Sequence, residues 1–254
     1  MLAHEARLAL GPRDGFGDPA LEAGKRINLR RAVAAFDGLV VTPERPLSFW
    51  RALGRVTEGR GYTWGRELRG GCVVPAIGGG LCLLSNALFE AAVWSGWQIH
   101  ERHGHSLEAI APPAGAVPLD ATVAWPDVDL VIAPTRGRAR LAVGIEGDDL
   151  RVAIFAAQAS DERVELSHEE AVVARSDERL RSIRVWRRRV SLSSGNVLSS
   201  EEVARTERRI LENDEIGKTC LSCGEVGCRD RPGEETLVAL RSFSKRSSLT
   251  SKKA

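Results

Sequence analysis

The chain has 254 residues, 43% of them hydrophobic, which is enough to bury a core in one large domain or in a domain with an appendage. Its 36 basic and 34 acidic residues give a formal net charge of +2, so charge offers no general case for binding nucleic acid or a membrane surface. No apolar run is long enough to span a bilayer. Because the first residues show no secretory signal and the five cysteines are an odd number, we expect a cytoplasmic protein in a reducing compartment.

The first quarter of the chain predicts a loosely ordered arm followed by short helices and a short strand. Residues 1–26 are rich in glycine, proline and charge and predict a loosely ordered arm. Asn28 is placed to cap a helix over residues 28–36, and residues 39–42 predict a short strand. Residues 48–53 predict a brief helix.

A glycine-rich stretch, residues 59–71, follows this region. It combines glycines with Tyr62, Trp64 and three arginines. The composition predicts a surface loop with an aromatic side chain folded onto the core. Its aromatic and cationic groups would also suit an anionic or sugar-bearing ligand.

The glycine run Gly78–Gly80 leads into the segment that carries the candidate chemistry. Glycines let the chain turn sharply and present bare amide groups. From Leu81 the apolar residues recur at helical spacing, which predicts a helix buried on most sides and ending at Gly96. Cys82 falls in the first turn, where free N–H groups and the positive end of the helix dipole favour a thiolate.

Two histidines and an aspartate complete a possible nucleophilic site. Residues 97–105 predict a strand whose His103 and His105 share one face. Asp120, in a predicted strand over residues 117–124, is placed to orient one of these imidazoles. In this hypothesis the cysteine attacks a carbonyl, a histidine transfers the proton, and backbone amides near Gly80 to Cys82 hold the oxyanion. The substrate-contacting residues would be Gly78, Gly79, Gly80 and Ser85.

Other interpretations of the same residues stay open. Free cysteine is often a small core residue, so Cys82 is also compatible with a purely structural role. The H-x-H pair His103 and His105 would bind a metal if Cys82 or Asp120 completed the ligand set. The glycine run Gly78–Gly80 would cradle an anion, although the P-loop lysine and a G-x-G-x-x-G motif are absent.

The second half of the chain predicts strands and then one helix. The predicted strands are residues 127–132, 141–145, 151–156, 163–166 and 183–190, with a hairpin turn at 147–149. Residues 199–202, Ser-Ser-Glu-Glu, offer a capping box for a polar helix to about residue 212. The last residues, 241–254, are basic and serine-rich and predict a disordered tail.

Three cysteines near the C-terminus form a possible metal site. Cys220, Cys223 and Cys228 are spaced as C-x2-C-x4-C, a pattern that can aim thiolates at one ion. A zinc site needs a fourth ligand, for which Cys72, a histidine or another chain are the candidates; an iron–sulfur cluster is the alternative. The remaining possibility is unligated thiols.

A family resemblance is carried by the stretch GGGLCLLSNALFEAAVWSGWQIHERHGHS and by the later PLDATVAWPDVDL. Together they resemble the signature of the VanW-like family, named from vancomycin-resistance gene clusters. The resemblance runs from about Ile27 to Leu130. It implies an association with cell-wall glycopeptide resistance and does not specify a reaction. Leu83 stands where the family usually has a glutamine, and Phe89 where it often has a tyrosine.

We therefore expect an α+β fold in which a buried helix packs on a mainly antiparallel sheet, with further strands and a C-terminal cysteine-rich segment. The order of cysteine, histidine and aspartate is similar to that of transglutaminase-like and papain-like enzymes. The expected divisions are an arm (1–26), a VanW-like core (27–135), a strand-rich extension (136–198), a helix with the cysteine segment (199–240) and a basic tail (241–254).

The function we expect is cysteine-dependent hydrolysis or acyl transfer at an amide of a peptide or peptidoglycan precursor. This chemistry requires no cofactor. The alternative is a non-catalytic, zinc-containing protein that binds a small ligand or regulates a partner.

Overall fold

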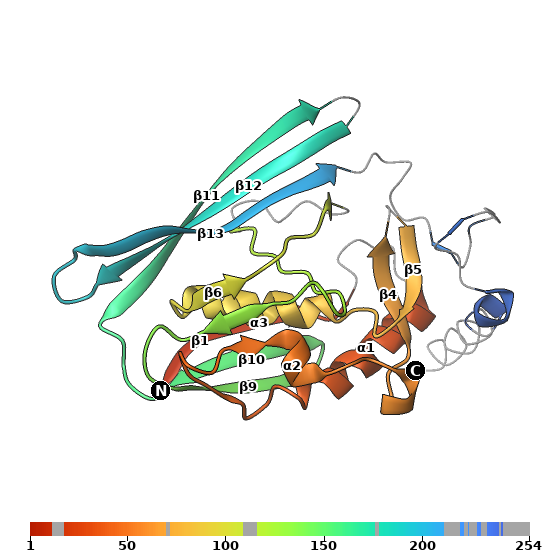
Figure 1. Cartoon of the computed structure of the whole chain (residues 1–254), viewed down its shortest axis with the longest axis horizontal. Coiled ribbons are helices and arrows are strands. Elements are labelled where there is room, and N and C mark those ends of the chain that lie inside the picture. Colours follow the sequence, from red (N-terminus) through yellow and green to blue (C-terminus); the bar gives the residue numbers. More distant parts are fainter. Residues whose placement is uncertain are drawn as a thin grey trace. The chain divides into compact units, whose positions relative to one another are not determined.

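The structure is a computed structural model, and it describes residues 1–11, 18–69, 72–108, 116–175, 178–210, 219–220, 223, 228–229, 233–238 and 240. It is mainly β, with antiparallel sheets and few helices (Figure 1). The chain forms two compact units, each built from separate segments. Unit 1 comprises Met1–Leu10, Ala32–Arg55 and Cys82–Ile210; unit 2 comprises Gly11–Arg31, Val56–Leu81 and Leu211–Ala254. The consecutive divisions expected from the sequence stay a prediction.

The first sheet of unit 1 has the strand order β1-β10-β9-β2. Its strands are β1 (Leu2–Ala9), β10 (Asp149–Ala156), β9 (Ala139–Glu146) and β2 (Val40–Val41). The expectation of a loosely ordered N-terminal arm is wrong for β1, which pairs antiparallel with β10. Its sequence, LAHEARLA, mixes apolar and charged residues; β10 supplies the backbone partners, and pairing with a distant strand cannot be read from local composition.

The predicted buried helix is α3 (Cys82–Trp94), which packs against β1 and β10. Its apolar residues lie on most sides, and Leu84, Leu88 and Phe89 are fully buried. Gly96 has a φ of 72°, a left-handed conformation that glycine adopts without strain and that ends the helix.

A second, small sheet of unit 1 has the order β3-β8-β6 and positions the segment after α3. It consists of β3 (Leu47–Ser48), β8 (Val131–Ala133) and β6 (Gln98–Glu101). The short helix α2 (Phe49–Leu53) begins where it is predicted, because the Ser48 hydroxyl accepts the Arg51 N–H at 3.1 Å.

The third sheet of unit 1 is formed by long strands in the order β11-β12-β13-β7 (Figure 1). They are β11 (Glu162–Arg175), β12 (Glu178–Ser191), β13 (Val197–Ile210) and β7 (Leu107–Glu108), and β7 runs parallel to β13. The polar helix expected over residues 199–212 is wrong, because Val197–Ile210 is strand β13. Its residues Ala204, Thr206 and Arg208 are buried alternately, with period 2. Two of these inward positions are polar, so the hydrophobic pattern did not reveal the strand.

Unit 2 contains most of α1 (Pro19–Val33), the 3-10 helix η1 (Glu58–Arg60) and a hairpin of β4 (Trp64–Arg69) and β5 (Cys72–Ile77). The prediction that Asn28 caps a helix is wrong, because Asp18 caps α1 by accepting the Ala20 N–H at 2.9 Å. Asn28 instead binds the backbone of Thr63 and donates to the Gly79 carbonyl, at 2.9 to 3.0 Å. Tyr62 is buried, so its ring belongs to the packing of this unit.

Among the residues described, no helix combines the length and the hydropathy that crossing a membrane requires.

Candidate functional site

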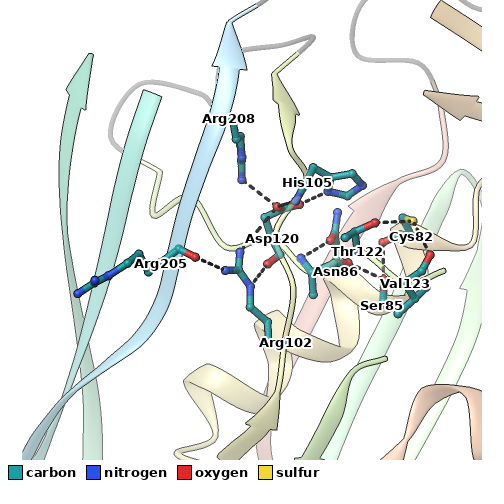
Figure 2. Close-up of polar contacts among 11 residues, drawn as sticks. Cys82, Ser85, Asn86, Arg102, His105, Asp120, Thr122, Val123, Arg205 and Arg208 are labelled. Atoms are coloured by element: carbon teal, nitrogen blue, oxygen red, sulfur yellow. Dashed lines mark hydrogen bonds and ion pairs between the residues drawn. The ribbon is translucent and has the colours of Figure 1, made fainter. Parts of the chain in front are cut away.

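Cys82 is the first residue of α3 and lies in unit 1, half-buried. Its Sγ is 3.5 Å from the Thr122 hydroxyl and 3.7 Å from the Val123 carbonyl oxygen (Figure 2). The segment carrying these two residues runs beside α3. The strand predicted over residues 117–124 is reduced there to single bridges, one of which joins Thr122 to His103.

His105 and Asp120 form the most closely coupled pair of the site (Figure 2). One oxygen of the Asp120 carboxylate is 2.5 Å from Nδ1 of His105, and the other accepts the backbone N–H of His105 at 2.7 Å. The carboxylate therefore fixes both the ring and the backbone of the histidine. The imidazole also interacts with Cys82, and this interaction shifts the pKa of both side chains.

The pKa shifts of these groups all favour the charged forms. Burial alone would raise the pKa of Asp120, but the hydrogen bond from His105 outweighs it and lowers the pKa to about 2. Burial alone would lower the pKa of His105, but the hydrogen bond to Asp120 and the interaction with Cys82 raise it to about 10. Burial alone would raise the pKa of Cys82, but the interaction with His105 leads the effects that bring it below its usual value. The arrangement therefore stabilises a thiolate beside an imidazolium.

The structure distinguishes the two candidate histidines. Strand β6 ends at Glu101 after a register shift, so the expectation that His103 and His105 share a strand face is wrong. The His103 side chain is 46% exposed, and its Nε2 lies 3.0 Å from the Glu101 carboxylate. His105 is the histidine that contacts both Cys82 and Asp120.

Ser85 has a structural environment. We expected it to contact substrate, but it is fully buried, and its hydroxyl donates to the carbonyls of Ala121 at 2.6 Å and Cys82 at 3.0 Å. Asn86 adds a second tie, because its side-chain oxygen accepts the Ala121 N–H at 2.7 Å. Both residues hold the segment of Thr122 against α3.

The glycine run Gly78–Gly80 belongs to unit 2, where it is tightly packed. A Cβ on Gly79 would lie 2.3 Å from the Gly65 carbonyl carbon, and one on Gly80 would lie 2.3 Å from Cγ of Lys25. Gly78 and Gly80 also have positive φ values of 80° and 98°. Close backbone approach and the turn explain these glycines. Their contact with a substrate stays a prediction.

Two arginines at the site were missed by the sequence reasoning. Arg208 of β13 has its Nη2 at 3.1 Å from Oδ2 of Asp120. Arg102 donates through Nε to the Asp120 carbonyl at 2.5 Å, and its Nη2 is 3.7 Å from the same Oδ2. Arginine usually lies on the surface, and the inward positions Thr206 and Arg208 are both polar, so no sequence signal indicated that Arg208 would point inward.

Among the described residues, the cysteines near the C-terminus are not arranged as the ligands of a metal ion. Cys220 is buried, and Cys223 and Cys228 are half-buried. A bridge between Val73 and Thr219 brings the β5 backbone, on which Cys72 lies, next to this region. Within the described ranges no group of three or more histidine, cysteine or acidic side chains is arranged to hold a metal ion. The zinc or iron–sulfur interpretation stays a prediction.

Comparisons with known proteins agree with the family resemblance seen in the sequence around Cys82 and Asp120. The family described as VanW like protein matches residues 24–155. The uncharacterized protein YoaR of Bacillus subtilis is 34% identical over 98 residues, which are 39% of this chain and 31% of YoaR. The vancomycin B-type resistance protein VanW of Enterococcus faecalis is 28% identical over 117 residues, 45% of this chain and 42% of VanW.

The chain thus spans less than half the length of either relative. No solved structure matches it. The matched residues include Cys82, His105 and Asp120 together with all of α3. Because the family match covers more than half of the sequence, the chain belongs to the VanW-like family.

Proposed function

We propose that Cys82, His105 and Asp120 are a catalytic triad for hydrolysis or acyl transfer at an amide of a peptide or peptidoglycan precursor. The observation that carries the proposal is the Asp120 carboxylate held on the His105 ring at 2.5 Å, together with the interaction of that ring with Cys82, which lowers the pKa of the thiol. A buried structural cysteine has no need of a histidine that is itself held at two points by a carboxylate.

In the first half of the reaction the thiolate of Cys82 attacks the amide carbonyl carbon and a C–S bond forms. The electron pair of the carbonyl moves to its oxygen, where the backbone N–H groups in the first turn of α3 provide positive potential. The His105 imidazolium then gives its proton to the amide nitrogen, the C–N bond breaks, and the amine leaves. The product is a thioester on Cys82.

In the second half neutral His105 accepts a proton from water or from an acceptor amine as that molecule attacks the thioester carbon. The C–S bond breaks and the electron pair returns to sulfur, which restores the thiolate and the imidazolium. Water as the nucleophile gives hydrolysis, and an amine gives acyl transfer. Asp120 keeps its charge and holds the ring in position throughout.

The proposal of a peptidoglycan precursor as substrate is supported by the name of a related protein. One relative is named a vancomycin B-type resistance protein, and the family resemblance implies an association with cell-wall glycopeptide resistance. Peptidoglycan precursors carry peptide amides, which are the bonds that a cysteine nucleophile of this kind attacks.

Trapping of the thioester tests the proposal. The full chain is mixed with a peptidoglycan-precursor peptide and quenched in acid, and intact mass followed by peptide mapping locates any acyl group. We expect an acyl adduct on Cys82, its loss in Cys82→Ala and His105→Gln, and its retention in the matched control His103→Gln. If the peptide binds equally well to wild type and Cys82→Ala but no adduct or product forms, the protein is a binding protein and the catalytic proposal is wrong.

A further inference from the structure

The Asp120 carboxylate lies against more positive charge than a triad needs (Figure 2). Besides His105 it faces two guanidinium groups, Arg208 at 3.1 Å and Arg102 at 3.7 Å, and their side chains are 10% and 5% exposed. Arg102 is held further by the Arg205 carbonyl, which accepts its Nη1–H at 3.0 Å, and its guanidinium lies 5.4 Å from the centre of the Phe89 ring.

This arrangement is costly for the fold. Two buried arginines share one carboxylate, and within the described residues Nη2 of Arg102 and Nε of Arg208 are buried without a hydrogen-bond acceptor. Buried N–H groups normally have partners, and a buried ion pair is seldom a net source of stability. Burial also lowers the pKa of Arg102 to about 10. An excess of buried positive charge is therefore poorly explained by stability alone.

The strand that carries Arg208 also positions the catalytic histidine. The Arg209 N–H of β13 donates to the Ser106 carbonyl at 2.8 Å, and β7 pairs with β13 directly after His105. Gly104 packs so closely on Thr206 that a Cβ would lie 2.5 Å from its side chain. Strand β13 thus contacts the backbone on both sides of His105 and, through Arg208, the carboxylate that holds its ring.

We propose that Arg208 and Arg102 are positioning residues of the reactive site, which fix the Asp120 carboxylate and supply the positive potential that keeps Cys82 as a thiolate. The proposal rests on the triad proposed above. The charges around the reactive atoms would then be three cations, from Arg102, Arg208 and His105, and two anions, from Asp120 and Cys82. The site keeps a net positive charge, which also favours the oxyanion that forms during attack. Because β13 lies outside residues 24–155, the third sheet becomes part of the active site and not an appendage.

The test is the rate at which iodoacetamide alkylates Cys82 at pH 7, located by peptide mass spectrometry in the full-length protein. Replacing Arg208 by Met removes a positive charge and loosens Asp120, and both effects disfavour the thiolate. At an effective dielectric between those of protein and water, we expect alkylation to slow by about three- to tenfold. The matched control is Arg184→Met, which breaks the 2.7 Å ion pair with Glu202 in the same sheet but does not contact Asp120.

Two conservative variants separate charge from structure. Arg208→Lys keeps the charge and should stay within about twofold of the wild-type rate, whereas Arg208→Gln keeps a buried donor and should slow as Arg208→Met does. Equal rates for Lys and Gln would overturn the positioning role, and this comparison remains available if the Met variant does not fold. If wild-type Cys82 reacts only as an ordinary thiol, the triad itself is wrong; if it is activated and no Arg208 variant alters it, only the role of Arg208 is wrong.

Discussion

Replacing Asp120 by Asn tests how the site is held together. The carboxylate is nine-tenths buried and is the counter-ion of Arg102, Arg208 and His105. An amide of the same shape leaves the buried Arg102 and Arg208 without this charge partner, and breaking a buried pair in this way costs about 3 to 5 kcal/mol. For a unit of this size that loss lowers the melting temperature by about 10 °C.

The pH dependence of this loss of stability provides a second test of the Asp120→Asn variant. The pKa of Asp120 is lowered from 3.8 to about 2, so the ionised carboxylate stabilises the folded state at every pH above 3.8. This contribution disappears as the pH falls through about 2, where the folded carboxyl is protonated. The difference in stability between wild type and Asp120→Asn should therefore be full at neutral pH and shrink between pH 3.8 and 2.

Thermal melts followed by circular dichroism measure the effect. The matched control is Asp37→Asn, whose exposed carboxylate, among the described residues, accepts only the Val143 N–H at 3.0 Å; this variant should change the melting temperature little. In a double-mutant cycle, Asp120→Asn combined with Arg208→Met should cost less than the sum of the single changes, because the stranded cation is gone. Equal melting temperatures for the two Asn variants, or simple additivity in the cycle, would refute the view that Asp120 holds this cluster.

Two further predictions concern the nucleophile and the glycine run. His105→Gln should slow alkylation of Cys82 at pH 7 by up to about 30-fold, since an unassisted thiol with a pKa of about 8.5 is only about 3% ionised there; an unchanged rate would show that His105 does not activate Cys82. Gly79→Ala would place a Cβ 2.3 Å from the Gly65 carbonyl carbon and should lower the urea midpoint of unit 2, whereas Gly59→Ala, with nothing within 4 Å, should not. Equal midpoints for the two alanine variants would show that Gly79 is not packed as described.

Features that depend on local sequence were predictable. The buried helix α3 follows from its apolar spacing, and Gly96 ends it as expected. The hairpin of β9 and β10 turns at Gly147, whose φ is 61°. The choice of Cys82 and Asp120 as neighbours also depended on local signals, namely the first turn of a helix and a polar residue in an extended segment.

Features that depend on distant partners were not predictable in the same way. Choosing between His103 and His105 requires the register of β6, which shifts before Glu101. The sequence of strand β13 predicts a helix because its inward residues Thr206 and Arg208 are polar. Their partners, Gly104 for Thr206 and Asp120 for Arg208, lie far away in the sequence. The N-terminal segment is likewise a strand, β1, because it pairs with β10. In each case the energy that decides the structure comes from a long-range contact.

The protonation state of His105 tests the central claim most directly. In nitrogen-15 NMR spectra of the imidazole at pH 8, with the resonance assigned by its loss in His105→Gln, we predict an imidazolium with both ring nitrogens protonated, because the pKa of His105 is raised to about 10. A neutral ring that titrates near the ordinary value of 6.5 would contradict the thiolate–imidazolium pair and the triad built on it.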